Sequence, residues 1–254
     1  DKGIFGFGSP ITAITNLVSN TGVVSSDVAG VGLGRGYLGS CEYGDDKGIF
    51  AYGEKSGGFC TSVSNLVSNT GVVSSDVTGV GTARRYLAAC EFGGDKGIFG
   101  FGREASYTAV TNLVSNAGVV ASDQAAVTGT ARYGPAACGY GDDKGIFGYG
   151  TTGSYVSTTN LVSNAGVVSS DVAGVGTAKD AHLAACEYGG DKGIFGFGTT
   201  GSATAVTNLV SNAGVVASDV TGVGTARHTA SACEYGGDKG IFGFGQTNTQ
   251  VSMT

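Results

Sequence analysis

Apolar and polar side chains alternate along short segments that recur through the whole chain. In GIFGFG, at residues 3–8, two Phe rings fall on one side of an extended backbone, and Ile and Gly fall on the other. This period of two is typical of a β-strand and not of a helix. The phrase that carries it, DKGIFGFG, occurs in six close copies about 48 residues apart, which indicates a repeat architecture. The copies begin at Asp1, Asp46, Asp95, Asp143, Asp191 and Asp238.

The two sides of this strand predict different neighbours. We expect the rings to form one apolar stripe, in which each buried ring contributes about 1.5–3 kcal/mol. The opposite side carries Gly or Ala in every copy, which favours the close approach of a neighbouring sheet. These small residues are Gly6, Ala51, Gly100, Gly148, Gly196 and Gly243.

Each repeat holds four such segments, for example at residues 83–93, 95–102, 108–116 and 118–123. The first two are joined by a Gly/Asp cluster and the last two by Ser-Asn-Ala-Gly or Ser-Asn-Thr-Gly, which are turn sequences. The pattern therefore predicts a four-stranded antiparallel sheet in each repeat. Such sheets bury both faces when they stack around an axis, so the expected fold is an all-β propeller, with a flat β-solenoid as the rival.

The unbroken repeat predicts a single domain over residues 1–254. The chain begins with a second strand and ends just after another, which leaves two ways to close a ring. Five blades close if the last first strand, near residues 226–236, completes the N-terminal sheet; otherwise there are six blades with an incomplete seam. The chain starts at Asp1 and its only methionine is Met253, so we expect a processed N-terminus or a segment of a longer chain.

Composition narrows the class of protein. Gly makes up 48 of 254 residues and Pro only 2, with no Gly-X-Y period, which excludes collagen and favours turn-rich β structure. The net charge is −6 and Lys and Arg are scattered, so nucleic acid is not an expected partner. No apolar run reaches the roughly 18 residues that span a bilayer, so no membrane partner is expected.

Five of the six cysteines occupy one position of the repeat, shortly before each DKG. Equivalent positions in successive sheets are too far apart for a disulfide, so we interpret these residues as small buried side chains. Cys60 lies outside this register and is the one cysteine that could find a partner. With two histidines and no Cys-x-x-Cys, the sequence predicts no metal site and no cofactor.

The order of these pieces resembles a known family, the kelch repeat. The matching pieces are Arg84, Ala88, Ala89, GIFGFG and TNLVSN, and the resemblance covers the whole chain. Two features differ: the usual Gly-Gly pair is Phe-Gly or Tyr-Gly, and the usual Trp is absent. The resemblance implies a propeller that serves as a binding module. KGIFGFG with TNLVSNTGVV is also similar to repeats in virion-associated proteins of phages, which implies a tail or fibre component.

Comparison of the repeats with one another separates constant from variable segments. The Cys-Glu-aromatic-Gly turn and NLVSN-x-GVV hardly change, whereas the segments after GFG and after the repeated Arg differ in each copy. Up-and-down strand order places the constant turns on one rim and the variable segments on the other, where binding is usual. Relaxed surface loops are the alternative interpretation. The candidate binding residues, rich in Tyr and Arg, are Tyr37, Arg85, Tyr86, Arg103, Tyr107, Tyr133, Tyr155, His182 and His228.

Other polar positions favour structural roles. The repeated Arg, replaced by Lys179 in one copy, is expected to bond neighbouring backbone and not to form a central anion site. The pairs Asp45/Asp46 and Asp142/Asp143 become Gly-Asp in other repeats, which indicates turn chemistry and not a calcium site. No GxSxG, HExxH or Walker motif occurs, so an enzyme is not expected.

These patterns together predict a non-enzymatic structural and recognition module of an extracellular or virion-associated assembly. It would bind a surface glycan or a protein receptor through the variable rim. One alternative is a kelch-like lectin. Another is a purely architectural protein whose constant rim contacts other subunits, so that the units join into a filament.

Overall fold

The computed structural model describes residues 2–124, 129–179 and 182–247, and every regular element among them is a β-strand. All strand pairs are antiparallel; among the described residues they form six sheets that each contain one copy of the GIFGFG strand, and one further two-stranded hairpin. The expectation of an all-β chain is confirmed. The strand ladders do not join these sheets into one closed sheet in the described ranges.

Four of the sheets have three strands and two have two. The first sheet is β1 (Gly3–Gly8) and β2 (Thr12–Val18), and the last is β17 (Ser231–Tyr235) and β18 (Lys239–Gly243). The complete sheets are β3 (Gly39–Tyr43), β4 (Lys47–Ala51) and β7 (Ser64–Val67); β8 (Ala88–Phe92), β9 (Lys96–Gly100) and β10 (Thr111–Val114); β11 (Ala136–Tyr140), β12 (Lys144–Gly148) and β13 (Thr159–Val162); and β14 (Ala184–Tyr188), β15 (Lys192–Gly196) and β16 (Thr207–Val210). A small hairpin, β5 (Glu54–Lys55) and β6 (Phe59–Cys60), lies between β4 and β7.

The prediction of four strands per sheet is wrong, because the GVV-x-S-D segment does not form a regular ladder. In the second repeat it makes only isolated bridges to β7, Val67 with Val73 and Ser64 with Val77. Between them the Ser74 hydroxyl accepts a hydrogen bond from the Leu66 backbone N–H at 2.9 Å. A side-chain oxygen takes the place of a backbone acceptor at this point. The ladder is interrupted in the same way in the repeats where Ala121 and Ala217 stand at this position, so the hydroxyl is not the cause.

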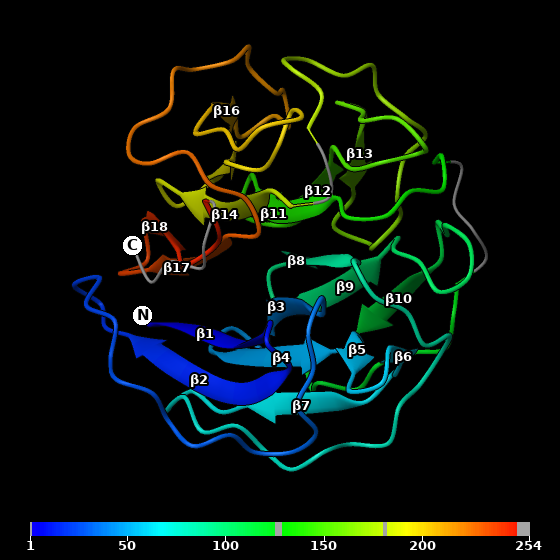
Figure 1. Cartoon of the computed structure of the whole chain (residues 1–254), viewed down its shortest axis with the longest axis vertical. Helices are drawn as coiled ribbons and strands as arrows, with labels where there is room; N and C mark the ends of the chain where they lie inside the picture. The colour runs from blue at the N-terminus through cyan, green and yellow to red at the C-terminus, as the bar shows by residue number, and fades with distance from the viewer. Residues whose placement is uncertain (1, 125–128, 180–181, 248–254) are drawn as a thin grey trace.

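We call β3, β8, β11, β14 and β17 the first strands, since each begins its sheet. Successive first strands contact one another, and in Figure 1 they gather at the centre of the molecule while β7, β10, β13 and β16 lie farther out. The last first strand, β17, contacts β1 of the first sheet. The sequence of sheet-to-sheet contacts thus returns to its start.

The small residues of the GIFGFG strands face the neighbouring sheet, as predicted. A Cβ built on Gly148 would lie 2.8 Å from Phe195 Cζ, and one on Gly100 would lie 2.8 Å from Phe147 Cζ. The space of the missing side chain is filled by a ring of the next sheet. This contact holds adjacent sheets close together.

The prediction of a single stripe of rings is wrong. Phe99 meets Tyr52 of the preceding sheet at 5.4 Å between ring centroids, whereas Phe101 meets Phe147 of the following sheet at 5.2 Å. Phe101 has φ = 62°, a left-handed conformation that ends the alternation and turns its ring to the other side. The same pairing links the last sheet to the first, since Phe244 lies 5.1 Å from Phe5.

The repeated Arg is structural, as expected. Arg132 is fully buried; its guanidinium lies 4.1 Å from the centroid of the Phe101 ring and its Nε donates to the Tyr149 carbonyl at 2.8 Å. Burial lowers its pKa to about 10, and Asp171, at 3.9 Å, acts in the opposite direction. Arg84, Lys179 and Arg227 likewise lie over a ring of one sheet and donate to a backbone carbonyl of the next, whereas Arg35 donates to the Asn65 side chain.

The alternative in which β17 completes the first sheet to give five is wrong. β17 pairs with β18, and β1 pairs only with β2 among the described residues. In the described ranges, six sheets contain a GIFGFG strand, and the first and the last of these have only two strands.

Candidate binding surface

The constant and variable segments lie at opposite ends of the strands, as the strand order predicts. At the constant end, the turn after each first strand meets the turn after the third strand; Asn164 Nδ2, for example, donates to Asp143 at 3.0 Å. At the variable end, the residue after the repeated Arg pairs with the segment after GFG, as in the bridge between Arg85 and Arg103. The Asp pairs are turn residues, with Asp45 at φ = 66° and Asp142 at φ = 65°.

A chain of backbone hydrogen bonds links the first strands at the variable end. Tyr86 N–H donates to the Tyr37 carbonyl at 2.8 Å, Gly134 N–H to the Tyr86 carbonyl at 2.7 Å, and Thr229 N–H to the His182 carbonyl at 2.8 Å. Tyr37, Tyr86, Gly134 and Thr229 have φ between 54° and 62°. Because main-chain groups make these contacts, the side chains at these positions can differ without loss of the linkage.

The aromatic residues at or next to these positions form a cluster that spans five repeats. Tyr37 and Tyr86 stack with ring centroids 4.3 Å apart, and Tyr86 contacts Tyr133 at 5.7 Å and His182 at 6.1 Å. His182 in turn lies 5.7 Å from His228. Burial and the neighbouring Tyr37 raise the pKa of Tyr86 to about 12, so its hydroxyl stays protonated.

Two arginines border the cluster. Arg85 pairs with Glu54 of the β5–β6 hairpin and lies 5.6 Å from the centroid of the Tyr86 ring. Arg103 lies 5.4 Å from the centroid of Tyr133. Each arginine thus lies over the face of a tyrosine ring, and this cation–π contact helps to orient both side chains.

The structure brings together eight of the nine sequence-predicted residues. Tyr107 joins through Tyr133, at 5.0 Å between rings, and His228 accepts or donates a hydrogen bond at 2.8 Å to Thr229. Tyr155 bridges to Thr151 through its backbone, and its exposed ring lies outside the chain of ring contacts. Sequence reasoning missed Glu54, whose place opposite Arg85 depends on the local hairpin.

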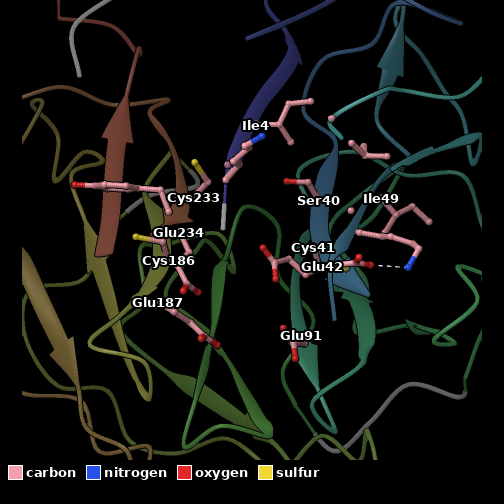
Figure 2. A pocket seen from close by; sticks show the side chains of 18 of the residues that line it. Ile4, Ser40, Cys41, Glu42, Ile49, Glu91, Cys186, Glu187, Cys233 and Glu234 are labelled. Atoms are coloured by element: carbon pink, nitrogen blue, oxygen red, sulfur yellow. Dashed lines mark hydrogen bonds and ion pairs between the residues drawn. The ribbon is translucent and has the colours of Figure 1, made fainter. Parts of the chain in front are cut away.

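The constant end opens into a cavity of about 650 Å³ between the first strands. Figure 2 shows Glu42, Glu91, Glu187 and Glu234 directed into this space from different strands. The residue two positions before each Glu also lines the cavity in three of these strands, as Ser40, Ala185 and Ala232. Alternation along the strand places the intervening cysteines between the sheets, where all of them are unpaired thiols.

The four carboxyl groups share one electrostatic environment. Burial, followed by the charge of nearby glutamates, raises the pKa of Glu42 to about 7 and those of Glu91 and Glu187 to about 8. Burial also raises the pKa of Glu234. Several of these groups therefore remain neutral near pH 7 and can act as hydrogen-bond donors as well as acceptors.

The meeting of these glutamates was not predicted from the sequence, because each belongs to a different repeat. Two signals together could have predicted the cluster: Glu alternates with Cys in the ACEYG strand, and the first strands of a propeller surround one centre. Within the described ranges, no group of three or more His, Cys, Asp or Glu side chains is placed to hold a metal ion.

Comparison with protein-family models gave no match, and no curated protein matched the sequence. In the part of the chain that the structure describes, no helix has the length and apolar character needed to cross a membrane.

Proposed function

We propose that this chain is a non-enzymatic recognition module: a β-propeller of six sheets that binds a glycan or a protein at its variable end. The propeller is supported by the like contacts between successive sheets and by the contact of β17 with β1, which returns to the first sheet. The extracellular or virion-associated setting, with the kelch-like and phage-like relationship, rests on the sequence resemblance.

One observation carries the proposal. Tyr37, Tyr86, Tyr133, His182 and His228 come from five repeats, yet their rings meet in one cluster at the end where the repeats differ. Stability alone does not require different side chains there, since the backbone makes the inter-repeat bonds. Aromatic rings with adjacent Arg and His groups suit both protein hot spots and the apolar faces of sugars.

The test is binding to a glycan array and to candidate receptor proteins by wild type and by Tyr86→Ala with Tyr133→Ala. We expect a specific ligand whose binding falls by at least about tenfold in the double variant, equivalent to about 1.4 kcal/mol. The matched control is Val119→Ala with Val167→Ala, two exposed residues of the constant segment, which should bind as wild type does. Unchanged binding by the tyrosine variant would refute the assignment to this end.

A second candidate, an architectural protein that joins into filaments, is favoured by a set of exposed valines. The first Val of each GVV segment is about two-thirds exposed, and the five lie at equivalent positions: Val23, Val72, Val119, Val167 and Val215. Repeated apolar exposure of this kind can support association. Electron micrographs of purified protein distinguish the candidates: filaments that disappear in the valine variant support this function, and separate discs contradict it.

A further inference from the structure

Two arginines oppose one another at the variable end. Arg85 and Arg103 exchange both backbone hydrogen bonds at 2.9 Å, so they lie directly opposite in an antiparallel pair. Side chains at opposed positions project to the same side, and two like charges placed there are destabilising. The equivalent pairs in three other repeats are Gly36 with Glu54, Tyr133 with Thr151, and His228 with Gln246. None of these three pairs joins two arginines, so the fold does not require the arrangement.

One of the two charges is neutralised within the chain and the other is not. Arg85 pairs with Glu54 of the β5–β6 hairpin. Within the described ranges, Arg103 takes part in no ion pair, even with the adjacent Glu104, and its buried Nε has no hydrogen-bond partner. The lysines of five DKG turns, in contrast, each pair with the Asp before them. Arg103 is only half-buried, so an acceptor from outside the chain can approach this uncompensated cation.

The row of opposed positions continues from Arg103 to an aromatic ring. Tyr107 bridges to Arg103 on the side away from Arg85, so the three side chains project to the same side. Tyr107 is 36% exposed, and its ring centroid lies 5.0 Å from that of Tyr133. The Arg103 guanidinium lies over the same Tyr133 ring, at 5.4 Å from its centroid. An uncompensated cation and a partly exposed ring are therefore neighbours.

The loops that follow the GIFGFG strands expose aromatic and hydroxyl groups. Among the described residues of these loops, the exposed large apolar side chains are all aromatic, and they are Phe59, Tyr107 and Tyr155. Exposed Ser106 and Ser154 directly precede the two tyrosines. A sugar ring stacks its apolar face on one aromatic ring and meets hydroxyl groups with its own, whereas a peptide anchors larger side chains in apolar pockets. This surface therefore favours a sugar over an acidic peptide.

We propose that this part of the variable end binds a sugar that carries a carboxylate, as a uronic acid or a sialic acid does. The carboxylate accepts hydrogen bonds from the Arg103 guanidinium, and the sugar ring stacks on Tyr107. The bound anion offsets the repulsion between Arg103 and Arg85, so the like-charge pair that weakens the chain alone favours the complex. This inference rests on the proposed function of the variable end and specifies its ligand.

The probe is an array of immobilised glycans that contain a uronic or sialic acid, each placed beside its methyl ester. The ester keeps the sugar and removes the negative charge, so the ratio of the two affinities measures the contribution of the carboxylate. Wild type should bind at least one acidic glycan, and should bind the ester of that glycan at least about tenfold more weakly.

The decisive variant is Arg103→Gln, which should bring the acid-to-ester ratio close to one, because Arg85 is already paired with Glu54. Tyr107→Ala should weaken binding of the acid and of its ester alike, by about tenfold, because the ring contacts both. The matched control is Lys55→Gln, which removes one positive charge from the β5–β6 hairpin outside the aromatic cluster. It should keep the wild-type ratio.

The stability of Arg103→Gln separates recognition from a structural role. This variant should melt close to wild type, because the lost contact with Tyr133 is offset by the lost repulsion from Arg85. A marked fall in its melting temperature would overturn the proposal.

Three binding results would also overturn it. The first is equal binding of acid and ester by wild type, the second is an unchanged ratio in Arg103→Gln, and the third is binding of a protein or peptide but of no glycan. In the first and third results, the proposed function of the variable end still holds if Tyr86→Ala with Tyr133→Ala abolishes the binding that is observed. Binding that survives in that double variant refutes both proposals.

Discussion

The five first strands run between the constant end and the variable end of the molecule, and the two ends are held together by different sets of contacts. Backbone bonds link neighbouring sheets at both ends: Gly93 N–H donates to the Asp143 carbonyl at the constant end, and Tyr86 N–H donates to the Tyr37 carbonyl at the variable end. The constant end adds side-chain bonds within its turns, since Lys144 and Asn164 both bond to Asp143. An end that also depends on such side chains must repeat them, whereas the side chains beside the backbone bonds of the variable end can differ.

The same comparison explains why the interior repeats so closely. The Phe195 ring occupies the space left by Gly148 of the adjacent sheet, and Arg132 lies over the Phe101 ring of the preceding sheet, so a substitution in one repeat changes the packing of the next. At the variable end, Arg103 is half-buried and lies 5.4 Å from the centroid of the Tyr133 ring. Substitutions between the sheets should therefore lower stability more than substitutions at the variable end.

The largest effect is expected for Arg132→Ala. This substitution leaves the buried Tyr149 carbonyl without its donor and the buried Phe101 ring uncovered, while the exposed Asp171 keeps its hydrogen bonds from Thr130 and Asn160. A hydrogen bond from a charged group contributes about 1.5–3 kcal/mol and a desolvated cation–π contact about 2 kcal/mol, so the loss should be about 3–5 kcal/mol. Urea unfolding should show that loss, while Arg103→Ala at the rim should cost about 1 kcal/mol or less. Similar losses of unfolding free energy in the two variants would contradict the different roles of the buried Arg132 and the rim residue Arg103.

A smaller effect is expected for Gly148→Val. Its Cβ would lie 2.8 Å from the Phe195 ring, so overpacking should cost about 1–3 kcal/mol. Gly148→Ala should be milder, because Ala51 occupies the equivalent position in the second sheet. The exposed rim substitution Ser154→Val should stay within about 0.5 kcal/mol. Equal melting temperatures for Gly148→Val and Ser154→Val would contradict the packing of adjacent sheets described here.

Glu187→Gln should change how stability depends on pH. The pKa of Glu187 is about 8 in the folded chain, against about 4.5 when exposed, so the native state binds the proton more tightly. Stability from this group is complete below about pH 4.5 and is lost as pH rises through 8. The Gln variant should match wild type near pH 5 and exceed it at pH 9 by about 1–2 kcal/mol, after allowance for water in the cavity. Parallel stability curves for the two proteins would contradict a shared acidic environment.

The sequence predicted the elements that are determined by residues near one another in the chain. Alternation in KGIFG gives the second strands, and the Asp-Asp and Ser-Asn turns follow their local chemistry. Alternation failed at Phe101, because a left-handed residue can be stabilised only by contacts with Phe147 and Arg132 of other segments. It also failed for the fourth strand, because the GVV-x-S-D segment makes only isolated bridges to the third strand, whether Ser74 or Ala121 stands at the variable position.

The candidate sites could be predicted only in part, because their residues lie far apart along the chain. The variable residues could be predicted to share an end, because strand order alone decides that. Which rings stack, and that Glu42, Glu91 and Glu187 share one cavity, depends on the number of sheets and on their spacing. No local pattern in one repeat contains that information.

The smallest effect is expected at the constant end, for Asn164→Ala. Its side chain donates to Asp143 at 3.0 Å in an exposed turn, and a single hydrogen bond of this kind contributes about 0.5–1.5 kcal/mol. The loss should add to the equivalent loss from Asn116→Ala, which bonds Asp95 in the neighbouring sheet, because each bond stays within its own sheet. Melting curves of the two single variants and the double variant measure this directly. If the double variant loses clearly more free energy of unfolding than the two single variants together, the constant turns stabilise one another around the molecule. The two ends would then differ in cooperativity as well as in hydrogen bonding.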